Sequence, residues 1–155
     1  MATKHAFHAQ LTWKKGGAGV ETGNHRVEFD GRPAVEVSAA SQYRGDPSKV
    51  NPEELFLASL ASCQMLTYLA LASRAGIDVL AYEDGADATV AIADRKMRVT
   101  EVVLRPRITI SGPADEAKAR SLVEAAHDGC FIANSVACTV RTEAEILREV
   151  GTLPP

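Results

Sequence analysis

Three cysteines carry the most reactive side chains in this sequence. Cys63 stands in the middle of a stretch without charged residues, residues 55–72, Cys130 follows Gly129, and Cys138 lies further along the chain. Buried cysteines often serve only as small apolar side chains, and this interpretation stays open for each of the three. Cys130 has an alternative role, because backbone N–H groups at the start of a new helical turn would lower the pKa of its thiol.

Metal binding is a second kind of chemistry that these side chains could support. His127 and Cys130 lie three positions apart, and Cys63 could add a third ligand. A structural zinc site needs a fourth ligand and usually shows close pairs such as CxxC or HxxxH, which the sequence lacks. We therefore expect no metal. A GxSxG motif and a phosphate-binding glycine loop are also absent from the sequence.

The composition is that of one globular domain. A length of 155 residues suits a single domain over residues 1–155, and 46% hydrophobic with 24% charged residues is ordinary for such a protein. A net charge of −3 without a basic run gives no reason to expect a nucleic-acid partner. The start of the chain, "MATKHAFHAQ", lacks the apolar core of a signal peptide. This predicts a cytoplasmic location, where structural disulfides are rare.

The uncharged stretch predicts a long helix that carries Cys63 into the protein core. Residues 55–72 are barely enough to cross a membrane, and polar residues such as Gln64 and Thr67 interrupt them. We therefore expect a buried core helix and no membrane partner. The apolar side chains surround most of the helix axis, so the helix is expected to be buried on most sides.

The ends of this helix are marked in the sequence. Asn51 is a suitable N-cap, Pro52 suits the first helical position, and Glu54 can complete a capping box with Asn51. Gly76 is suited to ending the helix.

The remaining elements follow from alternation of apolar residues and from turn residues. Asp30 and Gly31 predict a hairpin turn, Pro106 predicts an edge or a bulge in a long strand, and Glu116 and Arg120 predict a helical ion pair. Strands are expected over 7–13, 25–29, 33–37, 77–84, 86–94 and 98–110, helices over 52–74 and 112–129, and a short helical turn over 130–135. Residues 136–147 are expected to form a strand, or a strand that ends in a helix. The fold class is therefore α+β, an antiparallel sheet packed on a long buried central helix.

Two motifs resemble the OsmC/Ohr superfamily of thiol-dependent peroxidases. They are "NPEELFLASLASCQM", residues 51–65, and "AHDGCFIANSVACTV", residues 126–140. The strand segments "HRVEFDG" and "VTEVVLRPRITI" are similar to family strands as well, so the resemblance covers nearly the whole chain. It implies an intertwined OsmC-like homodimer with the long helices at its centre and with no metal or organic cofactor.

The resemblance also implies roles for individual residues. Cys63 matches the cysteine that attacks an organic hydroperoxide, and Cys130 matches the cysteine that resolves the resulting sulfenic acid into a disulfide. An external dithiol, small or protein-bound, then reduces the disulfide. Glu53 matches a glutamate that holds an activating arginine, although an acidic residue in a first helical turn also suits the helix dipole. On a straight helix Glu53 lies about 15 Å from Cys63, so the glutamate would serve the partner's cysteine.

The sequence departs from the family pattern beside the cysteine. Alignment on His25 puts Gly23 where relatives carry the arginine, and Arg44 is the better substitute because it lies just before the helix. Gln64 replaces a histidine that close relatives carry. We assign Gln64 and His127 to substrate binding and Cys138 to packing.

Two hypotheses therefore remain. The first is a cytoplasmic reductase of organic hydroperoxides that uses Cys63 and Cys130. The alternative is a small-molecule binding or redox-sensing protein on the same fold with little peroxidase activity, which the departures at Gly23 and Gln64 favour.

Overall fold

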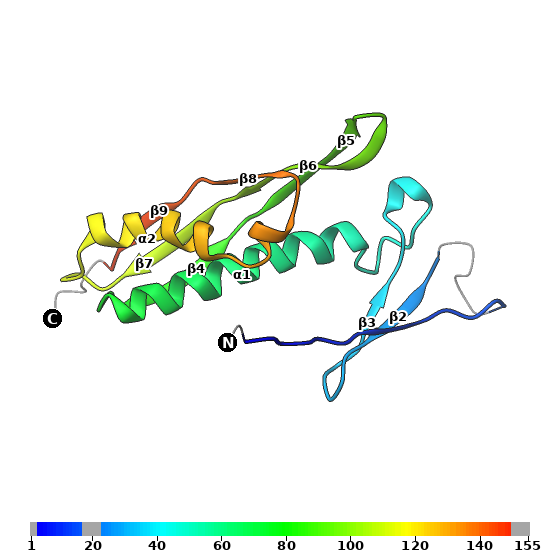
Figure 1. Ribbon diagram of the computed structural model, residues 1–155, viewed down its shortest axis with the longest axis horizontal. Coiled ribbons are helices and arrows are strands. Elements are labelled where there is room, and N and C mark those ends of the chain that lie inside the picture. Colours follow the sequence, from blue (N-terminus) through cyan, green and yellow to red (C-terminus); the bar gives the residue numbers. More distant parts are fainter. Residues whose placement is uncertain (1–2, 17–22, 150–155) are drawn as a thin grey trace, which may run out of the picture. The chain divides into compact units, whose positions relative to one another are not determined.

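The computed structural model describes residues 3–16 and 23–149 (Figure 1). The chain divides into two compact units, Met1–Leu55 and Phe56–Pro155, which are described separately. The single domain over 1–155 stays a prediction.

The first unit contains a small antiparallel sheet with the strand order β1-β2-β3. Its strands are β1 (Gln10–Thr12), β2 (His25–Glu28) and β3 (Val35–Val37). The predicted hairpin is confirmed, because β2 and β3 pair with Val27 opposite Val35, and Gly31 takes the positive φ of 68° that its turn requires. The strand expected over 7–13 is shorter than predicted, because only Gln10–Thr12 pair with β2. A short 3-10 helix, η2 (Ser41–Tyr43), follows.

Helix α1 (Pro52–Arg74) begins with the predicted capping box. The Glu54 N–H donates to Asn51 Oδ1 at 2.9 Å, and the Asn51 N–H donates to Glu54 Oε2 at 2.9 Å. The helix ends before Gly76, which has a positive φ of 71°.

The burial of α1 differs from the expectation. Within one chain only one stripe of α1 is buried, which consists of Leu60, Gln64, Tyr68 and Ala72. The prediction that the helix is buried on most sides was therefore wrong for a single chain. These residues recur every fourth position and thus lie on one face. Length and composition alone would let α1 cross a membrane, as they would the core helix of many globular proteins.

The second unit contains two mixed sheets with the strand orders β4-β7-β9 and β5-β6-β8. The strands are β4 (Val79–Asp84), β5 (Asp87–Ala93), β6 (Lys96–Leu104), β7 (Pro106–Ile110), β8 (Thr139–Thr142) and β9 (Glu145–Arg148). The prediction of a purely antiparallel sheet was wrong, since β8 runs parallel to β6 and β9 runs parallel to β7. The crossover through the second helix returns the chain in the same direction, which produces parallel pairs.

The long strand expected over 98–110 is divided at Arg105. Residues 96–104 belong to one sheet and residues 106–110 to the other. Pro106 is the first residue of β7, where its missing N–H is tolerated, and β7 is the central strand of its sheet. The prediction of an edge or a bulge at Pro106 was therefore wrong.

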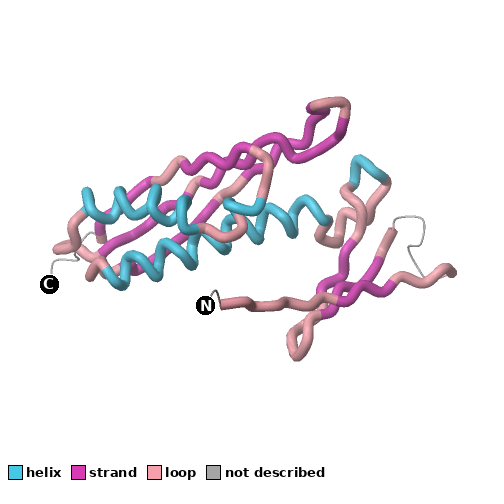
Figure 2. Tube along the Cα trace, in the orientation of Figure 1, coloured by secondary structure: helices cyan, strands magenta, loops and turns pink. Residues whose placement is uncertain are grey.

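Helix α2 (Glu116–Gly129) begins after Asp115, whose carboxylate accepts the Lys118 N–H at 3.0 Å. This cap explains why the helix starts later than predicted. The expected ion pair is confirmed, with Arg120 and Glu116 at 3.4 Å. Helices α1 and α2 run along the same side of the strands (Figures 1 and 2), and the Tyr68 hydroxyl joins them by donating to the Ala119 carbonyl at 3.1 Å.

Candidate active site

Cys63 and Cys130 come together where the end of α2 meets the middle of α1. Cys63 is half-buried on α1, and Cys130 is 1% exposed and caps the C-terminus of α2. Both are free thiols, and a hydrogen bond links their side chains. The structure thus brings the side chains of two residues that lie far apart in the sequence within hydrogen-bonding distance.

The Cys63 thiol ionises more readily than an ordinary thiol. Burial raises its pKa, but the Ile132 N–H, the Cys130 thiol and the Phe131 N–H all favour the thiolate, and the net pKa is lowered. The Thr67 hydroxyl is also close, but it has one proton, which it donates to the Cys63 carbonyl at 2.9 Å. We therefore attribute the lowered pKa chiefly to the two amides and the neighbouring thiol.

The Cys130 thiol is shifted in the opposite direction. Burial raises its pKa and the adjacent Cys63 adds to this effect, while the Ala133 N–H, which donates to Cys130 Sγ at 3.4 Å, opposes it without overcoming it. The predicted lowering of the Cys130 pKa was therefore wrong. Cys130 closes α2 and also begins the turn that follows, because its carbonyl accepts the Asn134 N–H at 3.0 Å. The amides of Phe131 and Ile132 favour the Cys63 thiolate. The pair is thus unequal, with Cys63 the first to lose its proton.

The CFIANS turn, residues 130–135, is held by hydrogen bonds of its own. The Asn134 side chain donates to the Asp128 carbonyl at 2.8 Å, and the Ser135 hydroxyl donates to the Phe131 carbonyl at 2.7 Å. The predicted short helical turn is confirmed as the 3-10 helix η3 (Ala133–Ser135). These bonds fix the backbone whose amides stabilise the Cys63 thiolate, so the turn acts as a small preorganised anion site.

Gly129 allows this turn to approach α1. A Cβ atom at Gly129 would lie 3.3 Å from Thr67 Cγ2, closer than ordinary contact. The sequence identified this residue only as a helix end, and nothing in the sequence signals its contact with Thr67.

Gln64 is buried and joins α1 to α2. Its Nε2 donates to the Val123 carbonyl at 3.1 Å, and its side chain is 1% exposed. Its Oε1 atom is buried without a partner in the described part of the chain. A structural role for Gln64 is therefore visible, and its predicted contact with substrate stays a prediction.

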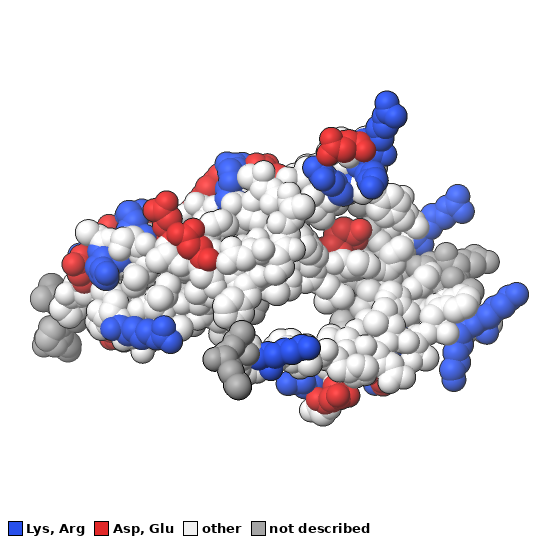
Figure 3. All heavy atoms as spheres, viewed as in Figure 1, with Lys and Arg blue, Asp and Glu red and all other residues white. Residues whose placement is uncertain are grey.

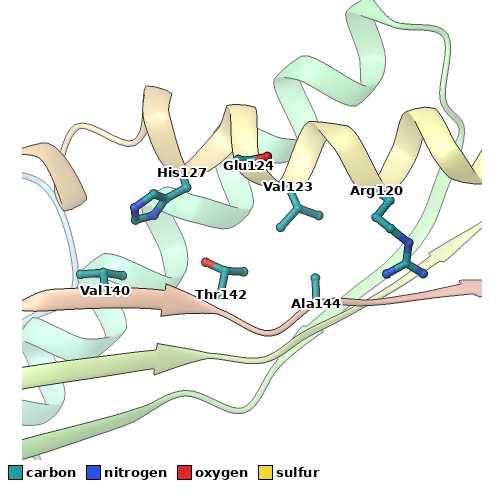
Figure 4. Close-up of a pocket in the computed structure, with 7 residues that line it drawn as sticks. All are labelled: Arg120, Val123, Glu124, His127, Val140, Thr142 and Ala144. Atoms are coloured by element: carbon teal, nitrogen blue, oxygen red, sulfur yellow. The ribbon is translucent and has the colours of Figure 1, made fainter.

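His127 lines a pocket of about 350 Å³ between α2 and β8, with Ala144 of the link between β8 and β9 at its edge (Figure 4). Its Nδ1 atom and the Thr142 Oγ1 atom are both buried, and neither has a partner among residues 3–16 and 23–149. Neither Cys63 nor Cys130 lines this pocket. The sequence did not single out Thr142, because an unpaired hydroxyl becomes visible only in the folded chain.

Glu53 and Arg44 both belong to the first unit. The Glu53 Oε2 atom is buried and has no partner within the described residues. Arg44 is exposed, follows η2 with a positive φ of 63°, and forms no ion pair in the described part of the chain. Their predicted action on Cys63 stays a prediction.

Gly23 and Cys138 complete the predicted set. Gly23 adopts a positive φ of 68°, a conformation that favours glycine, and its carbonyl lies 2.8 Å from His25 Nδ1. An arginine would be strained at this position. Cys138 packs with Leu60, Val102 and Leu104, as expected for an apolar side chain. The described residues contain no cluster of three or more histidine, cysteine or acidic side chains that could hold a metal.

Comparison with known proteins assigns the family. The OsmC-like protein family model matches residues 45–145. A solved OsmC-like protein of unknown function from Vibrio cholerae is 34% identical, with a TM-score of 0.83 over 92% of this chain and 100% of the other. An organic hydroperoxide resistance protein from Elizabethkingia anophelis is 22% identical, with a TM-score of 0.73 over 96% and 100% of the two chains.

A curated relative gives the same picture at the sequence level. The uncharacterized protein YmaD of Bacillus subtilis is 22% identical over 150 residues, 95% of this chain and 97% of its own. The matched family model spans both cysteines of the thiol pair. The chain therefore belongs to the OsmC-like family of the OsmC/Ohr superfamily.

Proposed function

We propose that this protein reduces organic hydroperoxides to alcohols with Cys63 as the attacking thiol and Cys130 as the resolving thiol. The observation that carries the proposal is the unequal thiol pair, in which the pKa of Cys63 is lowered and that of Cys130 is raised. Two similar solved proteins are named organic hydroperoxide resistance proteins, which supports the proposed substrate class.

In the first step the Cys63 thiolate attacks the distal oxygen of the hydroperoxide. The O–O bond breaks, the alkoxide takes a proton and leaves as the alcohol, and Cys63 becomes a sulfenic acid. The Ile132 and Phe131 amides stabilise the thiolate before the attack, which raises the fraction of Cys63 in the reactive form.

In the second step the Cys130 sulfur attacks the Cys63 sulfenic acid. The S–S bond forms and one water molecule leaves, with the thiol of Cys130 supplying a proton. The raised pKa of Cys130 keeps this thiol protonated until the sulfenic acid appears next to it. An external dithiol then reduces the disulfide by thiol exchange and restores both cysteines.

The apolar surface next to the thiols suits an organic rather than an inorganic peroxide. Phe131, adjacent to Cys130, is 82% exposed, and Leu66, three positions after Cys63 on α1, is 60% exposed. Apolar side chains of this size can bind the alkyl or aryl group of a hydroperoxide.

The same exposed surface supports the proposed homodimer. In Figure 3 the visible surface along α1 carries no charged side chain between the two ends of the helix. Uncharged helix surfaces of this kind commonly mark an interface, and a second copy would cover it. In such a dimer we propose that Glu53 and Arg44 of one subunit act on Cys63 of the other, and that the protein works in the cytoplasm without a cofactor.

The test is peroxide consumption by the reduced protein with cumene hydroperoxide and dihydrolipoamide. Turnover should vanish in Cys63→Ser and stay unchanged in Cys138→Ser, the matched control for a cysteine outside the pair. Equal turnover in wild type and Cys63→Ser would refute the proposed role of Cys63 in peroxide reduction. Disulfide formation between Cys63 and Cys130 without turnover would point instead to a redox-sensing protein.

A further inference from the structure

The pocket between α2 and β8 brings together two polar groups that lack partners within the described residues. His127 and Thr142 approach it from opposite walls, the imidazole from α2 and the hydroxyl from β8 (Figure 4). Both His127 Nδ1 and Thr142 Oγ1 are buried and unpaired within the described residues. Buried polar atoms are usually satisfied, so two unpaired atoms in one pocket indicate a ligand that supplies the missing hydrogen bonds.

The rest of the pocket wall is apolar except for two charged side chains. Val123, Val140 and Ala144 line it with aliphatic surface. Arg120 reaches toward the strands at one end, and the Glu124 carboxylate stays beside α2 in Figure 4. With about 350 Å³ the pocket has room for a small molecule.

The charged groups near the pocket largely balance, with a cation at the Arg120 end. Glu116 pairs with Arg120 at 3.4 Å and also with Arg148 at 3.3 Å, so one carboxylate faces two guanidinium groups. Glu124 also lines the pocket and is exposed, and its negative carboxylate lies beside α2, away from the strands. A ligand carboxylate between His127 and Thr142 meets two potential hydrogen-bond donors, while the Arg120 cation lies at the other end of the pocket (Figure 4).

We propose that this pocket binds a small aliphatic monocarboxylate. The carboxylate accepts hydrogen bonds from the Thr142 hydroxyl and from His127 Nδ1–H, because its two oxygens satisfy two donors at once. The alkyl chain packs against Val123 and Val140. The site is independent of the proposed peroxide chemistry, because neither cysteine of the thiol pair lines it.

The experiment is an NMR titration of the isotope-labelled full chain with hexanoate, and with hexanamide as the uncharged isostere. Hexanoate should shift the signals of His127 and Thr142 in a saturable way, and hexanamide should bind at least tenfold more weakly. Thr142→Val and His127→Phe should each weaken hexanoate binding at least tenfold. Thr139→Val should not, since Thr139 lies on the same strand and is exposed.

The outcomes distinguish the proposed carboxylate binding from the proposed peroxide reduction. Cys63→Ser should bind hexanoate as wild type does, so loss of peroxidase activity and loss of carboxylate binding are independent results. Absence of a saturable shift, equal binding of hexanamide, or unchanged binding by Thr142→Val would each overturn the proposal. Both Thr142→Val and His127→Phe are measured, so a folding defect in one of them does not decide the result.

Discussion

Gly129 lies against Thr67, where a Cβ atom on Gly129 would come within 3.3 Å of Thr67 Cγ2. The contact sets how closely the end of α2, and with it Cys130, approaches α1 beside Cys63. The reactive pair thus depends on a residue that carries no side chain.

We expect Gly129→Ala to slow the reaction of Cys63 with peroxide while changing stability little. The helical preference of alanine, at most about 1 kcal/mol, offsets part of the cost of the close contact. Stopped-flow measurement of Cys63 oxidation and thermal unfolding check the two effects. Thr67→Ser removes the Cγ2 atom and keeps the hydroxyl, so the double variant should recover the rate. A double variant as slow as Gly129→Ala would exclude this contact as the cause.

The pH at which Cys63 becomes reactive should depend on the side chain at position 130. Because its pKa is lowered, Cys63 should react with iodoacetamide at a lower pH than Cys130, whose pKa is raised. Cys130→Ala removes a hydrogen bond to the thiolate, so the alkylation midpoint of Cys63 should move to higher pH. Cys130→Ser keeps a donor and should leave the midpoint closer to wild type. Identical midpoints in the two variants would show that the side chain at 130 does not stabilise the thiolate.

Arg44 and Glu53 offer a test of charge assistance. If they act on Cys63 together, Arg44→Gln and Glu53→Gln should each slow peroxide reduction, by up to about a hundredfold, and the double variant should be no slower than either. Arg26→Gln is the control, because Arg26 already pairs with Glu28 and Glu36, each at 3.0 Å. A rate equal to wild type for Arg44→Gln would leave the amides and the Cys130 thiol as the activating groups.

Thr142→Val should leave the free energy of unfolding unchanged or raise it slightly. The hydroxyl is buried without a partner in the described chain, and valine has nearly the same shape without the unpaired oxygen. Urea unfolding measures the change against Thr139→Val. A loss above about 1 kcal/mol, the value of an ordinary hydrogen bond, would mean that the Thr142 hydroxyl has a partner in solution.

Local sequence signals predicted the elements well and their contacts poorly. The Asn51–Glu54 capping box, the turn at Gly31 and the Glu116–Arg120 pair all depend on neighbours in the chain, and the structure has each of them. The division of the strand at Pro106 depends on which sheet each half joins, and no local pattern encodes that choice. Resemblance to a family, not spacing, connected Cys63 with Cys130.

The electrostatics of the pair also exceeded what the sequence could tell. The pKa of Cys63 depends on the backbone amides of Phe131 and Ile132. The sequence does not reveal such groups, because nearly every residue has a backbone amide and only the fold decides where it points. Gly23 is a second example. In the sequence it was only the position where relatives carry an arginine, and its positive φ in the structure explains why a glycine is found there.

The parallel pairing of β8 with β6 and of β9 with β7 has a consequence for how the protein is made. These contacts join segments on either side of α2, and contacts between segments far apart in the chain are slow to form. The CFIANS turn lies between α2 and β8, so its amides can favour the Cys63 thiolate only after residues 130–135 have been synthesised and α2 has packed on α1. We therefore expect Cys63 to have an ordinary thiol pKa in a chain still leaving the ribosome, and the lowered pKa only in the folded chain.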